Sequence, residues 1–265
     1  MKISVEDIRK EYNPQEKADD DSLMMVRYIV RPLSFYVAWF FAIFGVSANS
    51  VTWISLIVSL LGTICLAMPG VAWKLTGCTL FFLWILLDHV DGNLARYYKS
   101  PSIVGDFLDT FVCYVTLAIF PVGLSIGISN SMGLPIEPKF IIVLGASAGI
   151  LGIFSRLLYQ KVTNYGLKIK FQNNNQPEDN VSLIKSFIKS SKMMANSILN
   201  PSGFLFPILF VFVYFNISLM YLLIYNLLLV IVNLLVIQKC LWKLNEFDII
   251  QSTLKKPAKS DASNE

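Results

Sequence analysis

Three long apolar stretches constrain the fold of this chain more than any other feature. They cover residues 49–68, 75–87 and 203–238. A helix needs about 20 apolar residues to cross a bilayer, and a soluble core could not hide this much apolar sequence. The composition agrees, because 55% of the residues are hydrophobic and only 15% are charged. The sequence therefore predicts an integral membrane protein.

Hydropathy and helix-end signals predict an all-α polytopic membrane protein with six transmembrane helices. Four segments have the length of one span each: 49–68, 73–98, 103–128 and 139–160. The stretch 203–238 is too long for one span, and the step at residues 216–218 divides it into two. Residues 33–46 would reach only roughly 21 Å as a helix. We expect an N-terminal interfacial helix there, with a short tilted span as the alternative.

The distribution of basic residues predicts the topology. With six spans, only Lys74 and Lys139 of the 22 Lys and Arg residues lie outside the cytoplasm. We therefore expect both termini and the loops 97–102 and 161–202 in the cytoplasm, and, for a prokaryotic chain, a location in the plasma (inner) membrane. The predicted parts are a polar N-terminal segment, a membrane domain and a polar tail, at residues 1–32, 33–240 and 241–265.

The loop 161–202 contains apolar residues at helical spacing, from Val181 to Ile198, with lysines between them. This pattern is typical of a basic amphipathic helix, either on an anionic membrane surface or packed on its own protein. The net charge of the chain is only +4, and its basic residues are not interleaved with aromatic ones. Nucleic acid is therefore not expected as a partner.

Four aspartates fall within 22 residues, inside or at the edge of predicted membrane helices: Asp88, Asp91, Asp106 and Asp109. Carboxylates near a membrane interior are costly, so each one indicates a function. At 100° per residue, Asp88 and Asp91 share a helix stripe with Gly92 and Ala95, and Asp109 shares one with Gly105. Carboxylates beside small residues suit a hard cation such as Mg²⁺ or Mn²⁺ and a phosphorylated ligand close to the backbone.

The same region resembles the CDP-alcohol phosphatidyltransferase family, whose signature reads D-x2-D-G-x2-A-R-x8-G-x3-D-x3-D. The matching residues are Asp88, Asp91, Gly92, Ala95, Arg96, Gly105 and Asp109. The resemblance implies that a substituted phosphate group passes from a CDP-linked alcohol to a hydroxyl of a lipid or small alcohol, with release of CMP. Such a reaction belongs to phospholipid or related glycoconjugate biosynthesis. The resemblance also implies a homodimer among membrane lipids, with an active site that opens to the cytoplasm.

The resemblance assigns roles to single residues. The metal ligands for Mg²⁺ or Mn²⁺ are Asp88, Asp91 and Asp109, and the donor-binding residues are Gly92, Ala95, Arg96 and Gly105. Gly92 and Ala95 make room for the cytidine, and Arg96 orients the donor or the carboxylates. Outside the motif, Arg156 either holds an acceptor phosphate or lipid headgroup or extends to the cytoplasmic edge. His89 lies off the carboxylate stripe and is expected to pack.

The chain departs from the family signature at its last position, where Cys113 replaces the fourth aspartate. A thiol with a reference pKa of about 8.5 is a poor base, and sulfur is a soft ligand that Mg²⁺ does not prefer. Asp109 and Asp106 are the remaining catalytic candidates, although Asp106 lies roughly 10 Å along the helix from position 113. Three interpretations stay open: an enzyme whose acceptor needs no such base, an enzyme with a relocated base, and a catalytically degenerate membrane binding or scaffolding protein.

Overall fold

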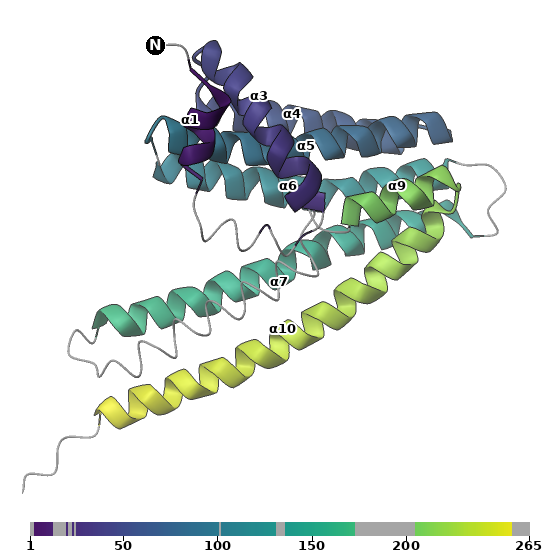
Figure 1. Cartoon of the computed structure of the whole chain (residues 1–265). Coiled ribbons are helices and arrows are strands. Elements are labelled where there is room, and N and C mark those ends of the chain that lie inside the picture. Colours follow the sequence, from purple (N-terminus) through teal and green to yellow (C-terminus); the bar gives the residue numbers. More distant parts are fainter. Residues whose placement is uncertain are drawn as a thin grey trace, which may run out of the picture. The chain divides into compact units, whose positions relative to one another are not determined.

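The computed structural model describes residues 3–12, 20, 23, 25–100, 102–130, 136–172 and 205–255. All regular secondary structure in these residues is helical (Figure 1), which confirms the predicted all-α class. The elements are α1 (Val5–Lys10), the π-helical turn η1 (Val26–Val30), α3 (Arg31–Ile43), α4 (Ala48–Ala67), α5 (Val71–Tyr97), α6 (Ile103–Ser129), α7 (Pro138–Gln172), α9 (Phe206–Tyr214) and α10 (Ser218–Lys255). The amphipathic helix predicted between Val181 and Ile198 lies outside the described residues.

Six described segments are long and apolar enough to cross a membrane, which agrees with the predicted number. They are Val26–Ile43, Ala48–Ala67, Val71–Tyr97, Ile103–Ser129, Pro138–Gly166 and Ser218–Asp248. The predicted bounds of the spans in α4, α5 and α6 are correct to within two residues. Helix α7 extends 12 residues beyond the predicted end at 160.

The set of six differs from the predicted set at two places. The segment expected to be interfacial is longer than predicted, because η1 leads directly into α3 and gives 18 helical residues, or about 27 Å. In contrast, the described part of the span expected from 203 is α9, whose nine residues reach only about 14 Å. The division between α9 and α10 is as predicted, since Asn216 has φ +56° and ends the helical path. The interfacial position of α3 stays a prediction.

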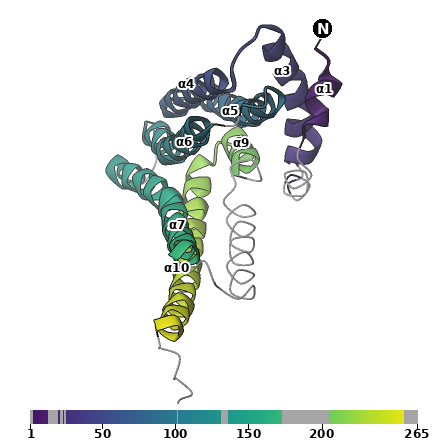
Figure 2. The ribbon, with the colours of Figure 1, turned by 90° about the vertical axis from the view of Figure 1, so that its left-hand side faces the viewer.

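Helix α4 packs closely against both α5 and α6, which Figure 2 shows nearly end-on. Glycines make these contacts tight. A Cβ atom at Gly77 of α5 would lie 2.8 Å from the carbonyl oxygen of Gly62, and one at Gly127 of α6 would lie 1.9 Å from that of Leu66. Small residues allow membrane helices to approach until their backbones touch. Helix α4 therefore fixes α5 and α6 relative to each other.

Helices α1 and α3 cover the C-terminal half of α5. Their shared core contains Ile8, Phe35, Ala38, Ala42, Val51, Leu87, Val90 and Leu94. Helix α1 begins with a capping box: Ser4 Oγ accepts from the backbone N–H of Asp7, whose carboxylate accepts from that of Ser4. The indole N–H of Trp39 in α3 donates to the carbonyl of Ile3 at 2.9 Å. The N-terminal segment is thus attached to the helix that carries the first two motif aspartates.

Buried aromatic rings join α9 to α5 and α6. Phe206 stacks on Phe81 with ring centroids 4.8 Å apart, and Phe120 meets Phe206 edge-on at 5.1 Å. Asn226 of α10 donates to the carbonyl of Leu144 in α7 at 3.1 Å and accepts from the Ser147 hydroxyl at 2.8 Å. Asn226 therefore joins α10 to α7.

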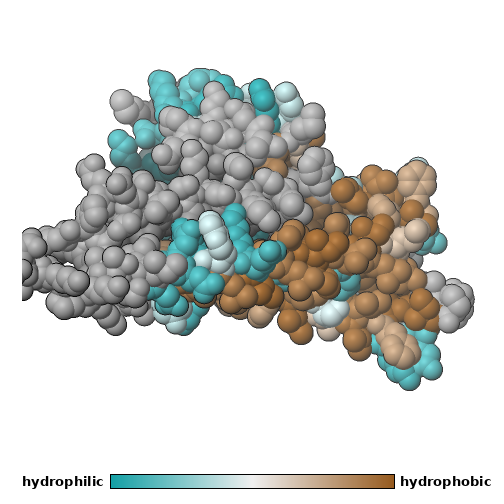
Figure 3. All heavy atoms as spheres, turned by 90° about the horizontal axis from the view of Figure 1, so that it is seen from below, coloured by the Kyte–Doolittle hydropathy of each residue, from teal (hydrophilic) through white to brown (hydrophobic). Residues whose placement is uncertain are grey.

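Large hydrophobic side chains also lie on the surface, where Figure 3 shows them gathered in a continuous area beside hydrophilic ones. The large hydrophobic residues that are exposed include Trp53 and Ile57 of α4 and Leu223 and Leu227 of α10, each between 45% and 62% exposed. Exposed apolar surface of this extent is expected on helices that face lipid. The structure therefore agrees with an integral membrane protein.

The described residues fall into two compact units. The first lies within Met1–Ile153 and Met193–Leu229, and the second within Phe154–Lys192 and Val230–Glu265. The second unit has a core of its own around Val162, Cys240 and Phe247. The motif residues all belong to the first unit. The predicted parts 1–32, 33–240 and 241–265 stay a prediction.

Candidate functional site

Asp91 is the most deeply buried of the four aspartates. It lies on α5 where α4 packs against that helix, and only 6% of the residue is exposed. The Thr52 hydroxyl of α4 donates to Asp91 Oδ2 at 2.7 Å. A buried carboxylate is costly unless it accepts hydrogen bonds or faces a cation. Thr52 therefore supports Asp91 and also fixes its orientation.

Asp88 and Asp109 bring carboxylates together from two different helices. Their side chains are in hydrogen-bond contact, although Asp88 belongs to α5 and Asp109 to α6, and Asp109 interacts electrostatically with Asp91 and Asp106. Asp109 is exposed, whereas Asp88 is partly buried. Two carboxyl groups approach this closely only when they share a proton or a cation. The contact places the stripe of α5 that carries Asp88 opposite the stripe of α6 that carries Asp109.

The donor chemistry at this place suits a divalent cation, because carboxylate oxygens are the ligands that Mg²⁺ and Mn²⁺ prefer. Within the described part of the chain, however, no three His, Cys, Asp or Glu side chains are close enough together to hold one metal ion. Asp88 and Asp109 are in contact, while Asp91 is bound to Thr52. The three-ligand set of Asp88, Asp91 and Asp109 thus stays a prediction.

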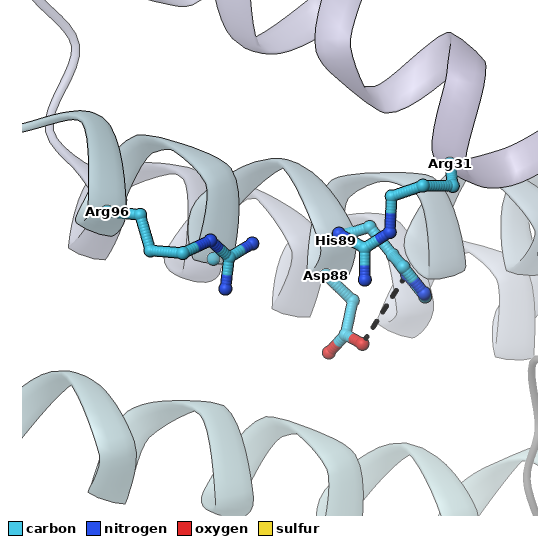
Figure 4. A pocket seen from close by; sticks show the side chains of 5 residues that line it. Arg31, Asp88, His89 and Arg96 are labelled. Carbon is cyan, nitrogen blue, oxygen red and sulfur yellow. Dashed lines mark ion pairs between the residues drawn. The ribbon is translucent and has the colours of Figure 1, made fainter. Parts of the chain in front are cut away.

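A pocket of about 140 Å³ lies beside the carboxylates. It is lined by Arg31, Asp88, His89, Gly92 and Arg96 (Figure 4). Arg31 reaches it from the start of α3, while the other four residues come from α5. Two guanidinium groups and a carboxylate on one small pocket form a surface that can bind phosphate oxygens directly and through a cation.

Gly92 gives the pocket part of its space. Among the described residues, the three atoms nearest to a Cβ atom there would all belong to the guanidinium group of Arg96, with Nη2 at 3.4 Å. At Gly77 and Gly127, in contrast, the nearest atom is a backbone oxygen of α4. The absence of a side chain at Gly92 is therefore not required for helix packing, and it leaves the backbone of α5 accessible to a ligand. Gly92 and Arg96 both lie where the signature predicts a donor site.

His89 lines the pocket, although its position off the carboxylate stripe predicts packing. Its side chain is 10% exposed and lies 4.0 Å from Asp88 Oδ2, the pair marked in Figure 4. Its Nδ1–H, however, donates to the carbonyl of Ile85 at 2.8 Å. This bond orients the ring within its own helix, so the contact with Asp88 is secondary.

Several predicted residues do not line this pocket. Ala95 is half-buried on α5, and Gly105 lies in the first turn of α6, where its N–H donates to Ser102 Oγ at 2.9 Å. A Cβ atom at Gly105 would lie 3.2 Å from Asn49 Oδ1 of α4, so packing also favours glycine there. Asp106 lies in the same first turn, where the helix dipole stabilises a negative charge. Arg156 belongs to the second unit, and its acceptor-binding role stays a prediction.

Asn93 is a site residue that the motif does not reveal. Its Oδ1 accepts from Arg31 Nη1–H at 3.2 Å and from Arg96 Nη2–H at 2.9 Å, and its Nδ2–H donates to the Ser34 hydroxyl at 2.9 Å. Only 2% of Asn93 is exposed. In the sequence, the available sign of this role is that the amide residue Asn93 lies between two motif residues. Only the position of α3 shows which groups Asn93 joins.

Cys113 lies one helical turn beyond Asp109 on α6 and is half-buried. The fourth position of the signature therefore continues the face of α6 that carries Asp109.

Comparison with known proteins agrees with the motif. Residues 45–172 match the family described as CDP-alcohol phosphatidyltransferase, a range that includes α4, α5, α6 and α7 and every motif residue. No curated protein matches the chain.

Proposed function

We propose that the chain transfers a substituted phosphate group from a CDP-linked alcohol to an acceptor hydroxyl, because its residues 45–172 match the CDP-alcohol phosphatidyltransferase family. CMP is the second product. The acceptor is a lipid or a small alcohol, and the reaction serves phospholipid or related glycoconjugate biosynthesis. The observation that carries the proposal is the meeting of Asp88 and Asp109 beside the pocket that Gly92 and Arg96 line.

The reaction needs a site for two neighbouring phosphates and a group that accepts one proton. The acceptor oxygen forms a bond to the phosphorus of the transferred group, and the bond between that phosphorus and the oxygen of CMP breaks. A divalent cation, Mg²⁺ or Mn²⁺, would neutralise charge on the phosphate oxygens, and Asp88, Asp91 and Asp109 are the residues proposed to hold it. Arg96, folded over Gly92, would bind a phosphate oxygen from the other side of the pocket.

We assign the acceptor's proton to Asp109 in the absence of a fourth aspartate. Asp109 is the exposed member of the carboxylate pair, so an acceptor hydroxyl can reach it. Asp106 is the alternative base, but its place in the first turn of α6 is explained by the helix dipole alone. A proton shared between Asp109 and Asp88 would leave with the products or the solvent.

The second candidate function is a binding or scaffolding membrane protein without turnover. Cys113 favours it, since the thiol replaces the residue expected to complete the signature. In that case the pocket still binds the CDP group, while the transfer step is lost. Membrane lipids and a second copy of the chain remain proposed partners in both cases. The cytoplasmic opening of the site and both cytoplasmic termini are proposed with them.

The experiment is metal-dependent CMP release from a panel of CDP-alcohols, with the full chain in nanodiscs. Asp109→Asn should abolish release, whereas Asp106→Asn, the same change one turn away, should retain most of it. If Asp106→Asn abolishes release and Asp109→Asn retains most of it, the base is Asp106. If the wild type binds CDP and releases no CMP, the binding function replaces the enzyme. Restoration of release by Cys113→Asp would then identify the missing group.

A further inference from the structure

The N-terminal segment contacts the pocket through Arg31. Arg31 Nε–H donates to Asp20 Oδ2 at 2.6 Å, and Arg31 Nη2 forms an ion pair with the same oxygen at 2.5 Å. Only 10% of the Arg31 side chain and 14% of the Asp20 side chain are exposed. Asp20 precedes α3 in the chain and belongs to none of the membrane helices. A charge-assisted pair at this degree of burial strongly favours one orientation of both groups.

Tyr12 contacts both members of the Arg31–Asp20 pair. Its hydroxyl donates to Asp20 Oδ2, and its ring lies under the Arg31 guanidinium, with 4.7 Å from Cζ to the ring centroid. Tyr12 also packs edge-on against Phe35 of α3 at 5.6 Å, so the ring itself is held. The guanidinium is therefore fixed by a carboxylate in its plane and an aromatic ring on its face.

On the pocket side, Asn93 joins Arg31 to Arg96. Both guanidinium groups donate to the single oxygen Oδ1, at 3.2 and 2.9 Å. Placing two cations on one amide oxygen costs electrostatic repulsion, which an anionic ligand in front of them relieves. Both arginines line the pocket next to Asp88 and Gly92 (Figure 4).

We propose that Arg31 and Arg96 together bind phosphate oxygens of the CDP-linked donor, and that Asp20 and Tyr12 are positioning residues that hold Arg31 in place. This assignment rests on the proposed function for the identity of the ligand. It makes the N-terminal segment part of the donor site, although the family match begins only at residue 45. A simple structural attachment of the segment would require neither the shared Asn93 nor the proximity of the pocket.

The test uses the full chain in nanodiscs with Mg²⁺ and CDP as the probe. Asp20→Asn and Arg31→Lys should each weaken CDP binding about tenfold or more, because a charge-assisted bond contributes roughly 1.5–3 kcal/mol. Tyr12→Phe keeps the ring and loses only the hydroxyl, so a smaller loss is expected. Glu11→Gln is the matched control: it removes the same charge next to Tyr12, but Glu11 is exposed and does not line the pocket. Its CDP affinity should equal that of the wild type.

Kinetic measurements distinguish a positioning role of Asp20 from a role in stability alone. In a chain that releases CMP, Asp20→Asn should raise KM for the donor with little change in kcat, and Asp20→Glu should restore part of the loss. Unchanged CDP affinity in folded Asp20→Asn and Arg31→Lys, with only a lower Tm, would overturn the proposal and leave a structural attachment. Loss of CDP binding in Asp20→Asn would support it even if the wild type releases no CMP, which would refute the proposed function alone. A wild type that binds no CDP would overturn both.

Discussion

Gly92→Ala should separate ligand space from helix packing. The three described atoms nearest to the added methyl group would be Arg96 Nη2, Nη1 and Cζ, at 3.4, 3.6 and 3.8 Å. These atoms form the far end of a flexible side chain, which can move by a few tenths of an ångström. No positive φ is present at this residue, so alanine fits the backbone. The fold therefore accepts the substitution, whereas a ligand that touches the α5 backbone does not.

The expected effects of Gly92→Ala on stability and on catalysis have opposite signs. Alanine is favoured over glycine inside a helix by about 1 kcal/mol, so Tm should stay unchanged or rise by about 2–4 °C. Catalytic efficiency should fall at least about 100-fold, which corresponds to roughly 2.7 kcal/mol of lost transition-state binding. The assay is CMP release at fixed donor concentration, with Tm measured on the same nanodisc preparation.

Gly127→Ala is the control for this argument. Its methyl group would lie 1.9 Å from the backbone oxygen of Leu66, and backbone cannot move aside cheaply. Overpacking of this kind costs about 1–3 kcal/mol, so Tm should fall. CMP release by Gly92→Ala within threefold of the wild type would refute the reasoning. A fall in Tm as large as that of Gly127→Ala would refute it as well.

Three further predictions concern hydrogen bonds. Thr52→Val removes the hydrogen-bond donor to Asp91 at nearly constant volume. The affinity for Mn²⁺, measured by electron paramagnetic resonance, should therefore fall about 10–100-fold. Unchanged affinity would exclude Asp91 from the cation site. Asn226→Leu breaks the hydrogen bonds to Leu144 and Ser147. The free energy of unfolding, measured by chemical unfolding, should fall by about 0.6–2 kcal/mol. An activity assay at low temperature should show that CMP release is retained. Hydrogen bonds from the Ser4 side chain and then its backbone lower the pKa of the Asp7 carboxyl, so the cap stabilises α1 at neutral pH and is lost as the pH falls through that lowered pKa. Amide exchange in α1, corrected for its intrinsic rate, should accelerate in acid, and Asp7→Asn should abolish this dependence.

The membrane helices were predictable because their signals are local. Length and hydropathy give the bounds of α4, α5 and α6 to within two residues, and Asn216 marks the end of α9. The failures also have local causes. The helix expected at 33–46 begins earlier than predicted, since η1 continues it ahead of Pro32, and the length expected for the span from 203 is not reached in α9.

The carboxylate motif was predictable for a different reason. Residues on one helix face recur at fixed spacing, so the stripe of Asp88, Asp91 and Gly92 follows from the sequence alone. The opposing stripe on α6 follows from the short connection between two antiparallel helices. Contact between Asp88 and Asp109 agrees with this reasoning.

The sequence by itself thus determined the helices, the membrane character and the carboxylate motif, because all three depend on local composition and helical periodicity. Only the tertiary structure decided what surrounds the motif. Thr52 lies 39 residues from Asp91, and Arg31 lies 62 residues from Asn93. No periodicity connects such positions, since their contact depends on how α3 and α4 pack against α5. The residues that orient the motif side chains therefore depend on helix packing and not on the sequence pattern.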